Sequence, residues 1–96
     1  MTAPIGTIYI IEFSRPLSHA RYYVGWTFQP VDERLKQHEA GQGAKITAAA
    51  VAAGIKLRVI YTVRGTRSDE RRIKIKKNTP RYVASLRRRG VIAPKA

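Results

Sequence analysis

Five side chains in this 96-residue sequence could together carry acid–base chemistry on a bound anion. Tyr9 and Tyr23 carry phenols, whose pKa of about 10 requires help from a neighbour such as an imidazole before they ionise. Arg34 and His38 are four residues apart, so in a helix they share a face. A planar guanidinium suits phosphate, and the carboxylate of Glu70 offers the hard oxygen that Mg²⁺ prefers.

Each of these residues also has an ordinary structural interpretation. Tyr9 could be a half-buried strand aromatic, as β-propensity alone predicts. Arg34 could form a surface ion pair with a neighbouring acid, which would contribute little to stability. Glu70 could simply favour the first turn of a helix. The residue types alone leave these alternatives open.

The charge distribution points to a polyanion as partner. Lys and Arg number 19 against six Asp and Glu, a formal net charge of +13, and ten of the 19 basic residues but none of the acids follow Glu70. Neutralised phosphates release condensed counterions, so nucleic acid is the expected ligand. The alternative is a solvated basic tail. The residues expected to contact a nucleic-acid backbone are Lys45, Arg71, Lys74, Lys77, Arg81, Arg87, Arg88 and Arg89.

Several other classes are disfavoured by composition. The sequence has no Cys, which excludes disulfides and thiolate metal sites and fits a reducing cytoplasm. Its N-terminus lacks the pattern of a signal peptide, and no apolar run is long enough to span a bilayer. A basic amphipathic helix with bulky apolar anchors, as a membrane surface would require, is also not evident.

The elements that must position these residues can be read from the pattern of residue types. Strands are predicted at Thr7–Phe13, Arg21–Trp26 and Leu57–Val63, the first two forming a hairpin around a loop at Ser14–Ala20. On this hairpin Tyr9 and Tyr23 should share one face, with Tyr22 on the other.

Four helices are predicted from their start and stop residues. They are Val31–Ala40 after Pro30, Ile46–Ala53 before Gly54, about Ser68–Lys77 after a capping box at Thr66–Asp69, and a last helix from Asn78 or Thr79 to Gly90, followed by a loose tail. The Ala-rich second helix is expected only to pack. Trp26 and Phe28 are assigned to the core in preference to base stacking.

These elements predict an α+β fold, with a small three-stranded antiparallel sheet flanked by helices in the order β-β-α-α-β-α-α. The length allows one domain, residues 1–96, with 79–96 as a basic C-terminal extension.

Four motifs in this order resemble those of the GIY-YIG endonucleases over about residues 6–77. Thr7-Ile8-Tyr9 and Tyr23-Val24-Gly25 resemble the two name-giving tripeptides, with Thr7 where the family usually has Gly. Arg34 with His38 is similar to the first-helix motif, and Glu70 followed by Ile73-Lys74 to the metal-binding motif. Segments 15–26 and 41–45 are similar to small stand-alone bacterial and phage members. Each tripeptide is weak evidence alone, and the ordered set is strong.

The resemblance implies a divalent-metal-dependent endonuclease that hydrolyses DNA phosphodiester bonds. Its catalytic residues would be Tyr9, Tyr23, Arg34, His38 and Glu70, with Glu70 holding Mg²⁺ or Mn²⁺ and with no small-molecule cofactor. It further implies a cytoplasmic protein of bacterial or phage origin that acts on DNA and not at a membrane. Two alternatives remain: a non-catalytic basic nucleic-acid-binding module on the same scaffold, and a structural protein of the ribosomal type.

Overall fold

The computed structural model describes residues 4–75 and 79–92 and confirms the predicted α+β fold and element order. The elements are β1 (Gly6–Leu17), β2 (Ala20–Thr27), α1 (Val31–Glu39), α2 (Lys45–Ala52), β3 (Leu57–Gly65), α3 (Arg67–Ile75) and α4 (Thr79–Arg88). Among the described residues, no helix is both long and apolar enough to cross a bilayer.

Strand β1 is the centre of the sheet, whose strand order is β2-β1-β3 with both pairings antiparallel. Tyr9 lies opposite Gly25 and Ile11 lies opposite Tyr23, so both tyrosines point to the same face, as predicted. Because helices cover both faces, the stretch from Ile8 to Phe13 is buried almost continuously instead of alternating.

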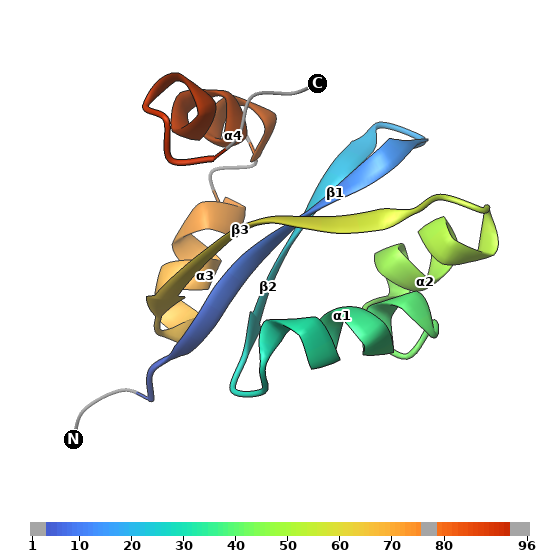
Figure 1. Cartoon of the computed structure of the whole chain (residues 1–96), viewed down its shortest axis with the longest axis horizontal. Coiled ribbons are helices and arrows are strands. Elements are labelled where there is room, and N and C mark those ends of the chain that lie inside the picture. The colour runs from blue at the N-terminus through green and yellow to red at the C-terminus, as the bar shows by residue number, and fades with distance from the viewer. Residues whose placement is uncertain (1–3, 76–78, 93–96) are drawn as a thin grey trace.

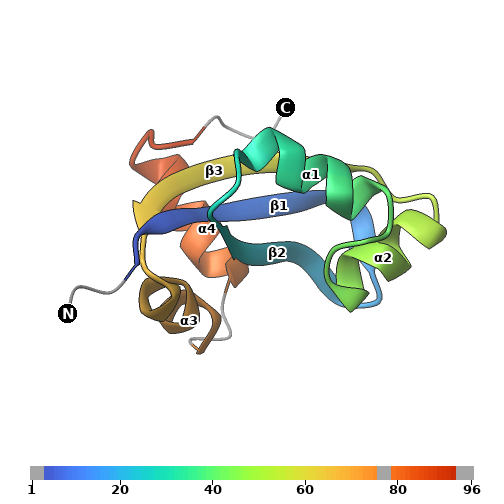
Figure 2. The same cartoon turned by 90° about the horizontal axis from the view of Figure 1, so that it is seen from below.

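The two faces of the sheet carry separate hydrophobic clusters. One contains Ile8 and Ile10 of β1 with Val83 and Leu86 of α4. The other contains alternate residues of β1, from Tyr9 to Phe13, with Ala50 of α2. Helices α1 and α2 therefore lie on one side of the sheet and α4 on the other, while α3 contacts β2 at the sheet edge (Figures 1 and 2).

The start of α3 is fixed by local hydrogen bonds. The backbone N–H of Thr66 donates to Asp69 Oδ2 at 2.8 Å, and the N–H of Asp69 donates to Thr66 Oγ1 at 3.2 Å. This reciprocal pair confirms the predicted capping box with Asp in place of the usual Glu. After α2, Gly54 adopts a positive φ of 79° and ends this helix, as predicted.

Two predictions about irregular segments were wrong. The chain continues as a strand through Ser14–Leu17 instead of forming a loop, and the turn is confined to Ser18 and His19. Exposed Pro16 is tolerated because the pairing with β2 is irregular between Glu12 and Leu17. Just beyond Gly90 the chain is still packed, because Ile92 is buried in the cluster that contains Val83 and Leu86. Residues 76–78, including the predicted cap Asn78, and residues 93–96 lie outside the described part.

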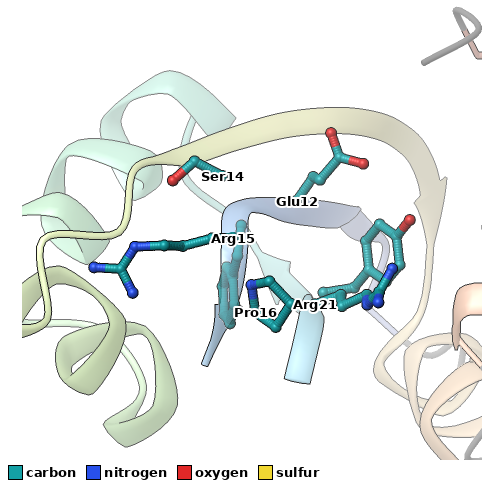
Figure 3. A pocket seen from close by; sticks show the side chains of 7 residues that line it. Glu12, Ser14, Arg15, Pro16 and Arg21 are labelled. Carbon is teal, nitrogen blue, oxygen red and sulfur yellow. The ribbon is translucent and has the colours of Figure 1, made fainter. Parts of the chain in front are cut away.

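A buried carboxylate attaches α4 to the sheet. Glu12 accepts hydrogen bonds from Arg58 of β3 at 2.9 Å and from Arg87 of α4 at 3.0 Å. Burial favours the neutral form of Glu12, but the two guanidinium groups outweigh it and lower its pKa below the ordinary 4.5. Glu12 and Arg15 both line a small hollow of about 110 Å³. In Figure 3 the Arg15 side chain extends away from Glu12.

The lowered pKa of Glu12 predicts acid-sensitive stability. The ionised form is favoured in the folded chain, so its contribution is present above the unfolded pKa and is lost as pH falls through the folded pKa. Glu12→Gln should reduce the free energy of unfolding by about 2 kcal/mol at pH 7 and by much less near pH 3. Urea unfolding at both pH values measures this. Exposed Glu39→Gln is the control, and equal losses at both pH values would contradict the prediction.

Candidate active site

The Tyr9 phenol and the His38 imidazole are joined by a buried hydrogen bond. Tyr9 OH lies 2.7 Å from His38 Nε2, although the residues come from β1 and α1. Tyr9 is 1% and His38 0% exposed. The register of the sheet directs Tyr9 toward α1, and the amphipathic turn of α1 directs His38 back toward the sheet.

The hydrogen bonds around His38 determine which ring nitrogen carries the proton. Thr47 Oγ1 donates to the carbonyl of Ala44 at 3.0 Å and lies 2.7 Å from His38 Nδ1. A hydroxyl has one proton, so Thr47 must accept at His38, and Nδ1 must donate. In a neutral imidazole Nε2 is then the acceptor, and Tyr9 donates its phenolic proton to it.

The pKa values fit this neutral arrangement. Burial, assisted by the positive charge of Arg34, lowers the pKa of His38 from 6.5 to about 4. Burial also raises the pKa of the Tyr9 phenol above 10, while a hydrogen-bonding interaction with Arg34 opposes the rise. At neutral pH the pair is therefore a phenol that donates to an uncharged imidazole.

Two glycines make room for the pair. A Cβ on Gly25 would lie 2.3 Å from the Tyr9 hydroxyl oxygen, and a Cβ on Gly43 would lie 2.0 Å from His38 Nδ1. No side chain fits at either distance, because real Cβ atoms keep about 3 Å or more from such neighbours. Gly25 thus allows the close approach of the Tyr9 ring.

Tyr23 and Arg34 line the outer side of the buried pair. The Tyr23 ring centroid lies 5.2 Å from that of His38 and 6.3 Å from that of Tyr9. Arg34 is half-buried, and its Nη1 donates to Gln37 Oε1 at 2.7 Å, instead of pairing with an acid in its own helix turn. Because Gln37 leaves the guanidinium charge uncompensated, Arg34 can bind an anion.

Helix α3 adds a carboxylate and an ammonium. Glu70 is close enough to influence the ionisation of Tyr9. Its Oε1 lies 3.0 Å from Lys74 Nζ, and this ammonium lies 5.2 Å from the centre of the Tyr23 ring. Among the described residues, no three or more His, Cys, Asp or Glu side chains lie together in a way that could hold a metal ion. One carboxylate fits a Mg²⁺ that keeps several waters and is also held by substrate phosphate.

All five residues proposed as catalytic are thus part of one connected cluster, in which phenols, imidazole, guanidinium and carboxylate contact or influence one another electrostatically. Sequence analysis missed Thr47 and Gly43. Thr47 was missed because the Ala-rich helix was expected only to pack. Thr47 carries the only hydroxyl of that helix, nine residues after His38, and this was the sequence feature that could have identified it.

The residues expected to contact nucleic acid are spread more widely than the cluster of Tyr9, Tyr23, Arg34, His38 and Glu70. Lys45, Arg71, Arg81, Arg88 and Arg89 are exposed, Lys77 lies outside the described residues, Lys74 pairs with Glu70, and Arg87 is half-buried against Glu12. The assignment of Phe28 to the core was wrong, because its side chain is 67% exposed, whereas Trp26 is half-buried and packs against the core.

Comparison with known proteins agrees with the geometry. Residues 5–83 match the model of the GIY-YIG catalytic domain, which covers most of the chain and includes all five residues of the cluster. The searches of curated proteins and of solved structures returned no match. Because this family model covers most of the chain, the chain belongs to the GIY-YIG family of nucleases.

Proposed function

We propose that this chain is an endonuclease that hydrolyses phosphodiester bonds of DNA with the help of Mg²⁺ or Mn²⁺. The observation that carries the proposal is the buried hydrogen-bonded chain from Tyr9 through His38 to Thr47, next to Arg34 and Glu70. This chain provides a route for a proton, a cation for phosphate and a ligand for a divalent ion within one cluster.

The proton route begins at water. As water attacks phosphorus, one of its protons passes to the Tyr9 oxygen while the phenolic proton passes to His38 Nε2. The new P–O bond forms as the bond to the 3′ oxygen breaks, which leaves a 5′-phosphate and, after the 3′ oxygen takes a proton from solvent water, a 3′-hydroxyl. His38 then returns its proton to Tyr9, which releases one to solvent.

Arg34 connects substrate binding to the basicity of His38. Its positive charge is one of the two causes that lower the His38 pKa in the free protein. A phosphate bound at Arg34 would neutralise that charge and add a negative one nearby, and both changes favour a protonated imidazole. His38 would therefore become a better proton acceptor when substrate is present.

Glu70 is the side chain that would hold the cation. When bound, Mg²⁺ or Mn²⁺ would polarise a phosphoryl oxygen and stabilise the departing oxygen. The carboxylate side chain of Glu70 is 12% exposed, and Lys74 contacts it through one oxygen. Tyr23, half-buried beside both Lys74 and His38, would orient the attacking water or the phosphate.

The exposed arginines suit contacts with the DNA backbone, which position a duplex without reading its sequence. Arg71 on α3 and Arg81, Arg88 and Arg89 on and after α4 are of this kind. Such binding should weaken steeply as salt concentration rises, because it depends on the release of condensed counterions.

Glu70→Gln tests the catalytic proposal. We expect cleavage of labelled DNA in Mg²⁺ or Mn²⁺ to fall by about 10²- to 10³-fold, the usual cost of removing one electrostatic contributor at an active site, with DNA binding little changed. Glu33→Gln on the exposed side of α1 is the matched control. If the wild-type chain binds DNA but cuts no duplex, single-stranded, branched or nicked form with either metal, the non-catalytic binding module replaces this proposal.

Thr47→Val tests the role of Thr47 as a positioning residue. The variant keeps the shape but leaves His38 Nδ1 without its acceptor, so kcat should fall by about tenfold with little change in KM. Thr47→Ser should restore the rate, and Thr27→Val is a control for the loss of a buried hydroxyl elsewhere.

The proton position on His38 gives a readout that altered packing alone would not change. The chain has only two histidines, so nitrogen NMR of the His19→Gln background reports His38 alone. We expect the proton on Nδ1 in this background and a mixture of tautomers after Thr47→Val. A proton that stays on Nδ1 in both would contradict the assigned role.

A further inference from the structure

An exposed aromatic ring lies beside a fixed one at the end of β2. Phe28 is 67% exposed, and its ring centroid lies 4.4 Å from that of Trp26 at an interplanar angle of 69°. The Trp26 indole N–H donates to the carbonyl of Gly65 at 3.0 Å, which holds the ring in place. A single exposed apolar side chain needs no explanation, but an oriented pair of rings is less usual.

A positive charge lies beside this pair. The guanidinium carbon of exposed Arg67 lies 5.3 Å from the Trp26 ring centroid. The rings and Arg67 line an open hollow of about 260 Å³, together with Pro4, Thr66 and Ser68. A flat apolar ring beside a guanidinium group is complementary to a planar base attached to a phosphate.

The hollow is also close to the candidate cleavage site. Arg67 and Glu70 are three residues apart on α3, which corresponds to a rise of about 4.5 Å and places them on neighbouring positions of one helix side. Trp26 pairs with Ile8 and packs on the opposite face of the sheet from Tyr9, so α3 at the sheet edge is the element that brings the two places together. A DNA strand that reaches Glu70 would therefore pass near the exposed ring.

We propose that Phe28, Trp26 and Arg67 form a stacking site for one unpaired nucleobase of the DNA substrate. The inference rests on the proposed nuclease function and makes it more specific. A base paired within a duplex presents only its edges, so the site selects DNA with an unpaired base near the cut, such as a flap, a branch or a single strand.

The only tryptophan of the chain makes the site directly observable, since Trp26 is its sole source of indole fluorescence. In metal-free buffer with EDTA, a short single-stranded oligonucleotide should quench this emission. An oligonucleotide of the same length made of abasic units should not, although its charge is the same. A blunt duplex should bind with little quenching. Equal quenching by the base-containing and abasic strands would overturn the proposal.

Removing the exposed ring gives the second measurement. Phe28→Ala should weaken binding of the single strand by about tenfold, within the range for loss of one stacking aromatic, and should leave the abasic strand unaffected. Val91→Ala, which shortens a side chain that is 51% exposed after α4, is the matched control. Unchanged single-strand affinity in Phe28→Ala would contradict the stacking site. A Trp26 emission maximum that shifts with protein concentration alone would also contradict it, because it would indicate a second copy of the chain on this surface.

These measurements separate the two proposals because they require no cleavage. A wild-type chain that never cuts DNA but shows base-dependent quenching would retain the stacking site and lose the nuclease proposal. A chain that cuts fully paired duplex as fast as flapped DNA, with the same rate after Phe28→Ala, would retain the nuclease and lose the stacking site.

Discussion

His38 is fully buried, and both of its ring nitrogens are hydrogen-bonded. Satisfying this one imidazole constrains the positions of several strands and helices. A buried polar nitrogen without a partner is costly, so a hydroxyl must lie at each end of the ring. Tyr9 on the central strand supplies one and Thr47 on α2 supplies the other. The sheet, α1 and α2 must therefore be placed together to within hydrogen-bond tolerance before the imidazole can be accommodated.

The need to place these hydrogen-bonding groups accurately explains several features outside the hydrogen bonds themselves. Gly25 and Gly43 lie against Tyr9 and His38 and leave no space for a side chain. On the opposite face, Val83 and Leu86 of α4 cover β1, and Arg87 reaches Glu12 on the same strand. The central strand is thus held from both sides, and the phenol on it has a fixed direction.

Most of the fold was predictable because its signals are local. Capping at Thr66 and Asp69, the stop at Gly54 and the β-rich runs each depend on a few neighbouring residues, and they were found in the sequence. The extension of β1 through Pro16 was missed because it depends on an irregular pairing with β2, which residue types do not indicate. The burial of Ile92 was missed because only the folded sheet and α4 offer a surface that covers it.

The site was predictable to the extent that its residues form recognisable motifs. The five motif residues lie together, but their chemical roles remain proposals. Thr47 could not be assigned from the motifs, because its importance comes from a contact between two helices. Phe28 was placed in the core on residue type alone, although a residue between a strand end and Pro30 has little opportunity to be covered.

The position of Tyr9 on the doubly paired strand has a consequence for the order in which parts of the chain open on heating. A central strand is usually among the last segments to exchange its amide protons, since opening it requires disrupting both neighbours. Tyr9 therefore lies on the strand expected to open last, whereas Phe28 lies in a connection outside any strand or helix. The proposed stacking ring and the proposed proton-transfer pair thus lie in regions that differ in expected local stability within 96 residues.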